Sequence, residues 1–91
     1  MMADMPESPD QLTVYKFQPG MTIRILKSFE DYDGQKIQEG EVLHLLETNY
    51  LPYESGHTLT FAEKTIRLSG DVGEEWVIIA NVDNTWYELV T

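Results

Sequence analysis

The residues able to carry acid–base or metal chemistry are few in this sequence, which holds 91 residues, two histidines and no cysteine. His44 and His57 fall in two segments that we expect to pair as neighbouring strands. Across such a ladder, two imidazoles and a nearby glutamate could bind zinc. His44 lies in an alternating segment with one solvated face, and His57 directly follows a loop, so we favour surface or partly buried histidines. A small metal-dependent hydrolase using His44 and His57 stays an alternative.

The sequence Asp31-Tyr32-Asp33-Gly34 is the nearest approach to a calcium-binding loop. Such a loop needs oxygen ligands at positions 1, 3 and 5, glycine at position 6 and glutamate at position 12. Counted from Asp31, the last three of these positions hold Gln35, Lys36 and Val42. Aspartate and glycine also favour a tight turn through hydrogen bonds from side chain to backbone. The pattern therefore predicts a structural turn with solvated carboxylates, and no metal site.

Covalent catalysis finds little support in the residues present. Serines occur at positions such as Ser28, Ser55 and Ser69, but the G-x-S-x-G pattern of a nucleophile elbow does not. Neighbouring acids such as Glu74 and Glu75 fit a solvated turn, because adjacent side chains of extended backbone point to opposite faces. We therefore predict no catalytic residue, no enzymatic activity and no cofactor.

Tyrosines next to acids are found in the segments that we expect to be loops. Tyrosine is enriched at protein interfaces, so we interpret residues 30–41 and 49–57 as a surface that contacts a partner. The candidate partner-binding residues are Asp31, Tyr32, Asp33, Tyr50, Tyr53 and Glu54. A structural role competes with this interpretation: Tyr50 and Tyr53 would then cover the open end of a barrel, with Pro52 setting the turn.

The charge is strongly acidic, with 16 Asp and Glu against 6 Lys and Arg and a net charge of −10. Because phosphate binding needs clustered basic residues, this balance excludes nucleic acids and anionic membranes as partners. No apolar run approaches the ~20 residues of a membrane span, and residues 1–10 lack the basic start and apolar core of a signal peptide. We therefore expect a cytoplasmic monomer. The acidity favours a basic partner, or it only keeps a small protein soluble.

From Gly20 onward, apolar residues recur with a period of two, which is typical of strands with one buried face. We predict strands within the segments 21–29, 42–46, 57–61, 65–68, 76–80 and 85–90. The segment 42–46 is apolar on both sides, so we place it centrally in the sheet. The most hydrophobic run, 76–80, is predicted to be a core strand. Residues 1–12 are expected to form a flexible acidic tail, and residues 13–91 a single domain.

Five to six short antiparallel strands would leave long open edges unless they roll into a barrel. The order of a first strand, a long acidic loop and a Gly40-Glu41 turn before a central strand is similar to that of SH3 domains. The paired tryptophans of peptide-binding SH3 domains are missing, so the resemblance extends to the architecture only. The predicted fold is all-β, a small SH3-like partial barrel. Its expected core is Met21, Ile23, Ile25, Phe29, Leu43, Leu45, Leu59, Phe61, Ile66, Leu68, Trp76, Ile78 and Leu89.

Three separated motifs agree in order with one family. They are F-E-D-Y-D-G at 29–34, G-E at 40–41 and Y-L-P-Y-E-S-G at 50–56, followed by L-T-F at 59–61. This arrangement resembles an uncharacterised bacterial family of domains of unknown function, whose members carry F-x-D-Y-D-G, G-E and L-P-Y-x-x-G. The resemblance covers about a third of the chain. It implies a compact bacterial domain, and no catalytic residue can be carried over from it.

The sequence therefore favours a non-enzymatic protein- or peptide-binding module that acts through its tyrosine-bearing loops. One alternative is an acidic inhibitor or immunity-type protein that neutralises a basic toxin or enzyme, which the net charge of −10 motivates. The other is the small metal-dependent hydrolase built on the two histidines. Each hypothesis requires that the fold place different residues close to one another.

Overall fold

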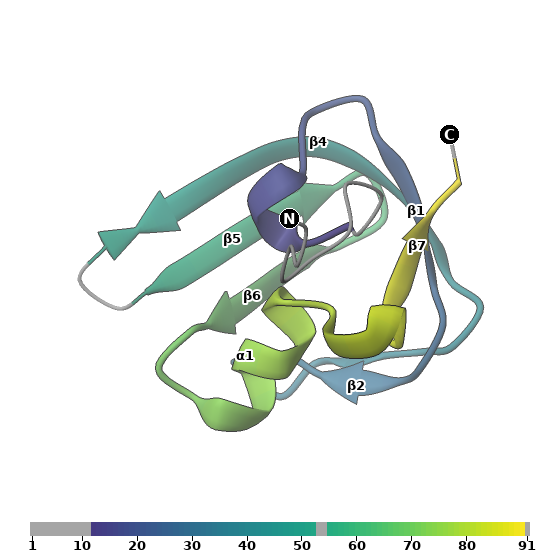
Figure 1. The fold of residues 1–91 in the computed structure, drawn as a ribbon. Helices are drawn as coiled ribbons and strands as arrows, with labels where there is room; N and C mark the ends of the chain where they lie inside the picture. The colour runs from purple at the N-terminus through teal and green to yellow at the C-terminus, as the bar shows by residue number, and fades with distance from the viewer. Residues whose placement is uncertain (1–11, 53–54, 91) are drawn as a thin grey trace, which may run out of the picture.

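A computed structural model describes residues 12–52 and 55–90. Five antiparallel strands form one sheet in the order β6-β5-β4-β1-β7 (Figure 1). They are β1 (Thr22–Ile25), β4 (Val42–Leu51), β5 (Gly56–Phe61), β6 (Thr65–Ser69) and β7 (Tyr87–Leu89). A separate two-stranded sheet pairs β2 (Phe29–Glu30) with β3 (Lys36–Ile37). The small all-β fold is thus confirmed, although the strands of the described residues do not close into a barrel.

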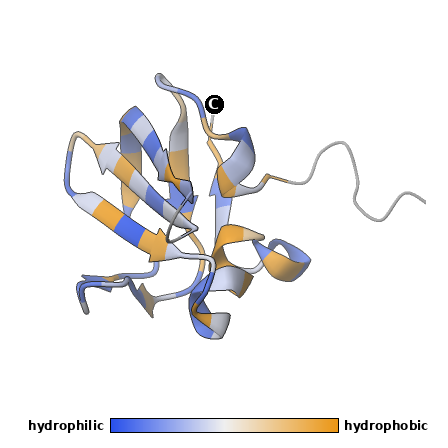
Figure 2. Cartoon of the chain, turned by 90° about the vertical axis from the view of Figure 1, so that its left-hand side faces the viewer, coloured by the Kyte–Doolittle hydropathy of each residue, from blue (hydrophilic) through white to orange (hydrophobic). Residues whose placement is uncertain are grey.

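Alternation of apolar and polar residues places one face of each strand in the core, as Figure 2 shows by hydropathy. Buried and more exposed residues alternate along β5 and through most of β1 and β6. The buried predictions that the structure confirms are Ile23, Ile25, Leu43, Leu45, Leu59, Phe61, Ile66, Leu68 and Ile78. Met21 and Phe29 are partly buried against this cluster. Leu12 also packs there, so the last residue of the predicted tail belongs to the domain; residues 1–11 lie outside the described residues.

The segment predicted as a core strand at 76–80 is instead helical, because α1 spans Gly73–Ile79. This segment connects β6 at one edge of the sheet to β7 at the other edge. Along this crossing, no strand of the described residues pairs with it. A helix satisfies its backbone groups internally, and this wins over the strand preference of a β-branched run. Ile78 and Ile79 face the core, whereas Trp76 is 47% exposed, so its assignment to the core is wrong. No helix in the described part of the chain is long and apolar enough to cross a membrane.

The core differs from the prediction at the chain ends as well. Leu89 is 50% exposed because it lies on the edge strand β7, so its predicted burial is wrong. Buried residues outside the expected core list are Val14, Phe17, Ile37, Ile79 and Tyr87. Val14 belongs to the 3-10 helix η1 (Val14–Lys16) and Phe17 follows it, and this helix packs over the inner face of the sheet.

Strand β4 is central in the strand order, as predicted, but it is not buried on both faces. Val42 and Leu46 are exposed, whereas Leu43 and Leu45 are buried. The strand also continues to Leu51, through residues expected to form a loop. A bulge between Leu45 and Glu47 shifts its register against β5, and such bulges bend a strand and increase its twist. The far half of β4 therefore projects beyond β1 (Figure 1).

Asn81 fixes the corner between α1 and β7. It is fully buried, and its backbone has a positive φ of 50°, which asparagine tolerates well. Its side-chain nitrogen donates to the carbonyls of Leu12 and Tyr87, and its oxygen accepts from the amide of Trp86. The next residues form the 3-10 helix η3 (Val82–Asn84). One satisfied amide thus joins the start of the described domain to its last strand.

Replacing Ile25 with alanine should lower the free energy of unfolding by ~2–5 kcal/mol, because a nearly inaccessible side chain leaves a cavity. The matched control is Leu46→Ala, at a leucine that is mostly exposed, which should cost no more than about 0.5 kcal/mol. Urea denaturation followed by tryptophan fluorescence measures both. Similar losses for the two variants would contradict the register of the sheet.

Candidate functional site

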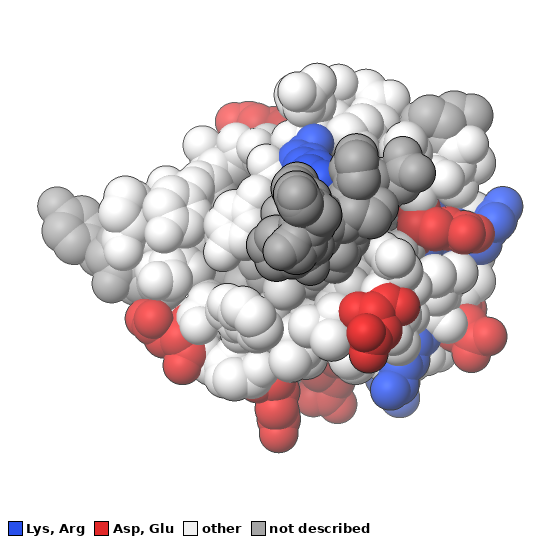
Figure 3. Space-filling model, in the orientation of Figure 1, with Lys and Arg blue, Asp and Glu red and all other residues white. Residues whose placement is uncertain are grey.

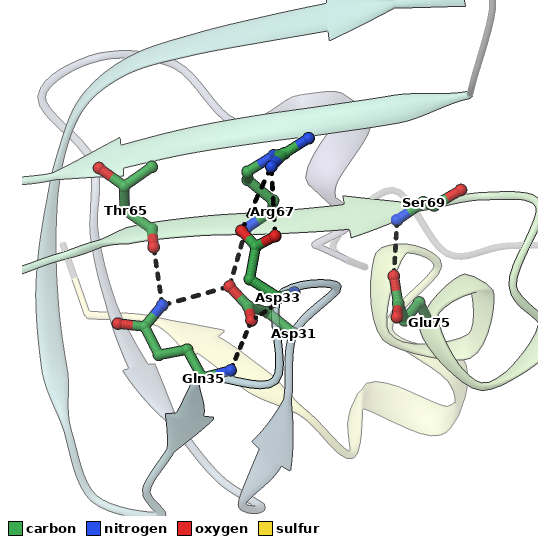
Figure 4. A network of polar contacts seen from close by, with 7 residues as sticks. All are labelled: Asp31, Asp33, Gln35, Thr65, Arg67, Ser69 and Glu75. Atoms are coloured by element: carbon green, nitrogen blue, oxygen red, sulfur yellow. Dashed lines mark hydrogen bonds and ion pairs between the residues drawn. The ribbon is translucent and has the colours of Figure 1, made fainter.

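The outward edge of β6 is covered by the side chain of Asp31 (Figure 4). One carboxylate oxygen accepts from the amide of Arg67 at 3.1 Å, and the other accepts from the amides of Asp33 and Gln35 at 3.0 and 2.9 Å. The Gln35 side chain bridges back, donating to Asp31 and to the carbonyl of Thr65. The Gly34 amide donates to the Asp31 carbonyl at 2.9 Å, so the predicted structural turn is confirmed. Asp31 is 4% exposed, so the prediction that its carboxylate is solvated is wrong.

Tyr32 and Asp33 extend this contact onto the surface. The Tyr32 amide donates to the Arg67 carbonyl at 2.7 Å, which docks the loop along the strand. The Arg67 guanidinium lies 3.2 Å from a carboxylate oxygen of Asp33 and 5.7 Å from the centre of the Tyr32 ring. The exposed Tyr32 ring is therefore held in place by a cation above it, a contact worth about 0.5–1 kcal/mol at exposed sites.

Glu75 of α1 covers the end of the same edge. One of its oxygens accepts from the amide of Ser69 at 2.8 Å, which ties the helix to β6. Burial raises the pKa of Glu75 above its usual value, the hydrogen bond from Ser69 opposes this, and the nearby carboxylates of Asp31 and Asp33 raise the pKa further. The outward-facing groups of β6 thus bind carboxylates from two separate elements.

The free half of the β4–β5 hairpin projects beyond β1 (Figure 1). We call it the arm, and it consists of residues 46–51 of β4 and 56–58 of β5. A pocket of about 280 Å³ lies where the arm meets the Asp31 loop, between Tyr32 and Arg67 on one side and Leu51 and Thr58 on the other. The structure therefore brings together the two segments that the sequence analysis predicted as a contact surface.

A second pocket, of about 310 Å³, lies between the arm and η1. Its aromatic wall centres on His57, whose ring lies 5.2 Å from that of Tyr15 and 4.8 Å from that of Tyr50. Phe17 and Thr48 contribute to the same pocket. His57 is 8% exposed, whereas both tyrosine rings are largely accessible, so a buried imidazole supports two exposed rings.

A third and larger groove, of about 540 Å³, lies between β2 and α1. Phe29, Val77 and Trp86 line it, together with carboxylates that include Glu30 and Glu74. The Trp86 ring is already in contact with a cation, because the Lys27 ammonium lies 4.8 Å from its centre. Acidic side chains thus surround an aromatic surface here.

The two histidines do not form a common site. His57 pairs with Tyr50 near the tip of the arm, whereas His44 lies beside Ala62 at the other end of the ladder. At about 3.3 Å per residue, roughly 20 Å of strand separates His44 from Tyr50. His44 instead contacts Glu63 at 2.6 Å, whose pKa is lowered by hydrogen bonds from the amide and ring of His44. No group of three or more metal-ligating side chains occurs within residues 12–52 and 55–90.

The predicted contact residues therefore differ in where they lie and how far they are buried. Tyr32 and Tyr50 are exposed beside the two pockets, as expected for contact residues. Asp33 is exposed and paired with Arg67, and Asp31 is buried as a structural residue. Tyr53 and Glu54 lie outside the described residues.

Four residues that line the two pockets were not named as candidate contact residues. Leu51 and His57 lie within the predicted contact segment 49–57, whereas Tyr15 and Arg67 lie outside both predicted segments. The alternation of 57–61 could have indicated that His57 shares the buried face of Leu59 and Phe61. Tyr15 and Arg67 are brought to the arm by long-range packing, for which the sequence has no local signal.

Replacing Asp31 with alanine should lower the free energy of unfolding by at least about 2 kcal/mol, because several amides lose their acceptor in a partly buried site. The variant should also self-associate more readily, since the edge of β6 becomes open to pairing. The control Asp33→Ala removes only an exposed ion pair and should cost about 1 kcal/mol or less. Chemical denaturation and light scattering measure the two effects, and equal losses in the two variants would contradict the role of Asp31.

His57 should make stability depend on pH. Burial lowers its pKa below the usual 6.5, so between the two values the unfolded chain binds more protons than the folded one. The free energy of unfolding should therefore rise with pH through this window and fall as the pH drops through it. Relative to His57→Gln, the wild type should lose stability when the pH is lowered from about 7.5 to about 5. Urea denaturation across this range measures it; a constant difference between the two proteins would contradict a buried neutral imidazole.

Comparisons with known proteins bear on the fold alone. No family model and no curated protein matches this chain. Among solved structures, it is similar to an integron cassette protein from the mobile metagenome of Vibrio cholerae. The similarity has a TM-score of 0.67 and 27% sequence identity, and it covers 80% of this chain and 87% of that chain. The chain thus shares its architecture with an integron cassette protein, which agrees with an uncharacterised family.

Proposed function

We propose that this protein is a non-enzymatic binding module that contacts a protein or peptide through the arm and its two pockets. The observation that carries the proposal is the gathering of exposed apolar and aromatic side chains on and beside the arm. These are Tyr15, Tyr32, Leu46, Tyr50 and Leu51. Tyr15 and Tyr50 line one pocket, and Tyr32 and Leu51 line the other. Exposed apolar groups gathered beside hollows are typical of interaction sites, and tyrosine is a preferred interface residue.

The charge distribution supports the same surface. Figure 3 shows the arm side of this face mostly without charged side chains, whereas acidic residues lie along the lower rim and the right side. An uncharged centre with a charged rim is the usual anatomy of a protein interface. The pockets provide hollows on either side of Tyr50 and Leu51 into which a partner's side chains can fit.

Replacing Tyr50 with serine should abolish most of this binding. A random linear peptide library displayed on phage is selected on the wild-type protein, and the enriched peptide is then titrated by calorimetry. Loss of an aromatic contact residue should raise the dissociation constant by at least about tenfold. The control Trp76→Ser removes an exposed aromatic side chain on α1, away from the arm, and should bind as tightly as the wild type. A selection without a consensus, or an equal loss in Trp76→Ser, would overturn the proposal.

The acidic inhibitor is the second candidate, and one observation favours it. Much of the positive charge is already neutralised within the chain, because Arg24, Lys64 and Arg67 pair with carboxylates. The remaining field is therefore strongly negative and would attract a basic protein. Raising the salt concentration in the same titrations separates the candidates: binding by charge weakens steeply, whereas binding through the arm changes little.

A further inference from the structure

Within residues 12–52 and 55–90, one edge of the arm has no neighbouring strand. The pairing of β4 with β1 covers Val42, Leu43 and His44, and the last contact on that side joins Leu45 to Gly20 and Met21. On its other side β4 pairs with β5 as far as Leu51. Residues 46–51 are therefore hydrogen-bonded along one edge, and Figure 1 shows this half of β4 projecting past β1.

The register shows which backbone groups face this edge. Arg67 turns its amide and carbonyl outward from β6, to Asp31 and Tyr32. In an antiparallel pair, two opposite residues either bond to each other or both turn their amides and carbonyls away, and the two cases alternate along the strands. Arg67 turns away from β5, so Thr58, which lies opposite it, turns away from β6 and faces β4. Its partner Asn49 then faces β5.

Thr48 and Tyr50, on either side of Asn49, must therefore turn their amides and carbonyls away from β5. Among the described residues, none forms a backbone hydrogen bond with these outward groups. The donors and acceptors of two alternate residues are thus presented in the geometry of a strand. An extended segment laid alongside them could bond to both residues in the ordinary ladder pattern.

Other edges of the same sheet are treated differently. Asp31 and Glu75 bind the outward amides of β6, and Asn81 binds the outward carbonyl of Tyr87 in β7. Proteins commonly cover strand edges in this way because an open edge recruits another chain. The open edge at Thr48 and Tyr50 therefore contrasts with the protection given to β6 and β7.

The aromatic pocket adjoins this open edge. Thr48 and Tyr50 lie opposite Leu59 and His57, so their side chains share the inner face of the arm. Both line the pocket that Tyr15, Phe17 and His57 complete. In a strand added beside β4, alternate side chains would point to this same face, and one of them could enter the pocket.

We propose that the edge of β4 at Thr48 and Tyr50 binds an extended segment of a partner protein as an added strand, with an apolar or aromatic side chain in the Tyr15–Tyr50–His57 pocket. This inference rests on the proposed function and specifies how the arm binds. Backbone hydrogen bonds would provide affinity, and the pocket would provide specificity. The exposed Glu47 favours a segment that carries a lysine or arginine.

A second copy of this chain is a poorer occupant of the edge. Each copy carries a net charge of −10, so self-pairing would bring two strongly acidic surfaces together. Like charges close to one another in a strand pair are also destabilising, and Glu47 lies within the open stretch. A neutral or basic partner segment avoids both costs.

The experiment compares backbone chemistry with side-chain chemistry in the full chain. The probe is the peptide enriched in the display selection, synthesised with unmodified amides and in two versions with alternate amides N-methylated. One methylated version should lose at least about tenfold in affinity and the other should keep most of it, since only alternate amides face β4. On binding the unmodified peptide, amide exchange at Thr48 and Tyr50 of the wild-type protein should slow.

Two variants at one position separate the backbone from the side chain. Thr48→Pro removes an outward amide that bonds to nothing in the described fold, and proline is tolerated at such edge positions. It should bind the peptide at least about tenfold more weakly than Thr48→Val, which keeps the amide and a side chain of similar shape. Unfolding midpoints check that both variants fold, and the exchange measurement on the wild type does not depend on either.

The outcomes distinguish this inference from the proposed function. If a peptide binds and Tyr50→Ser abolishes binding, but methylation and amide exchange show no effect, the module stands and strand addition is overturned. If no peptide is enriched, both proposals fail. If sedimentation shows a dimer whose Thr48 and Tyr50 amides are protected without peptide, a second copy occupies the edge and the partner assignment is overturned.

Discussion

The outward edge of β6 must be satisfied, and the loop that the carboxylate of Asp31 organises does most of this. Residues far apart in the chain meet at this one group, since it accepts from its own loop and from Arg67. The docked loop in turn positions Tyr32 against the arm. Glu75 continues the edge at Ser69 and holds α1 in place. The exposed surface around Tyr32 thus depends on a buried carboxylate.

A buried amide has the corresponding role at the other end of the sheet. The chain leaves β6, crosses as α1 and must turn to pair β7 with β1. Asn81 makes that turn in a left-handed conformation, and its side chain replaces the backbone partners that the corner lacks. The Tyr87 hydroxyl donates to the carbonyls of Ile78 and Ile79 at the end of the helix. Burial raises the pKa of Tyr87, so the hydroxyl stays protonated as a donor.

The arm differs from both of these closed edges. The bulge after Leu45 sends β4 beyond the reach of β1, so that its outer backbone groups and its exposed side chains occur together. An open strand edge next to an aromatic pocket is an aggregation hazard unless it binds a partner. Its retention beside edges covered by Asp31 and Asn81 supports an interaction role for this part of the fold.

The sequence by itself determined the strands with one buried face, because alternation is a property of neighbouring residues: Ile23, Ile25, Leu59 and Phe61 follow from it. It also predicted that Tyr32 and Tyr50 are exposed, as they are. Only the tertiary structure decided that 76–80 is a helix, that the two histidines lie apart, and that Asp31 is buried against Arg67. These outcomes depend on which strands are adjacent and where the chain must cross between edges. Such long-range constraints override local preference and leave no trace in the residue pattern.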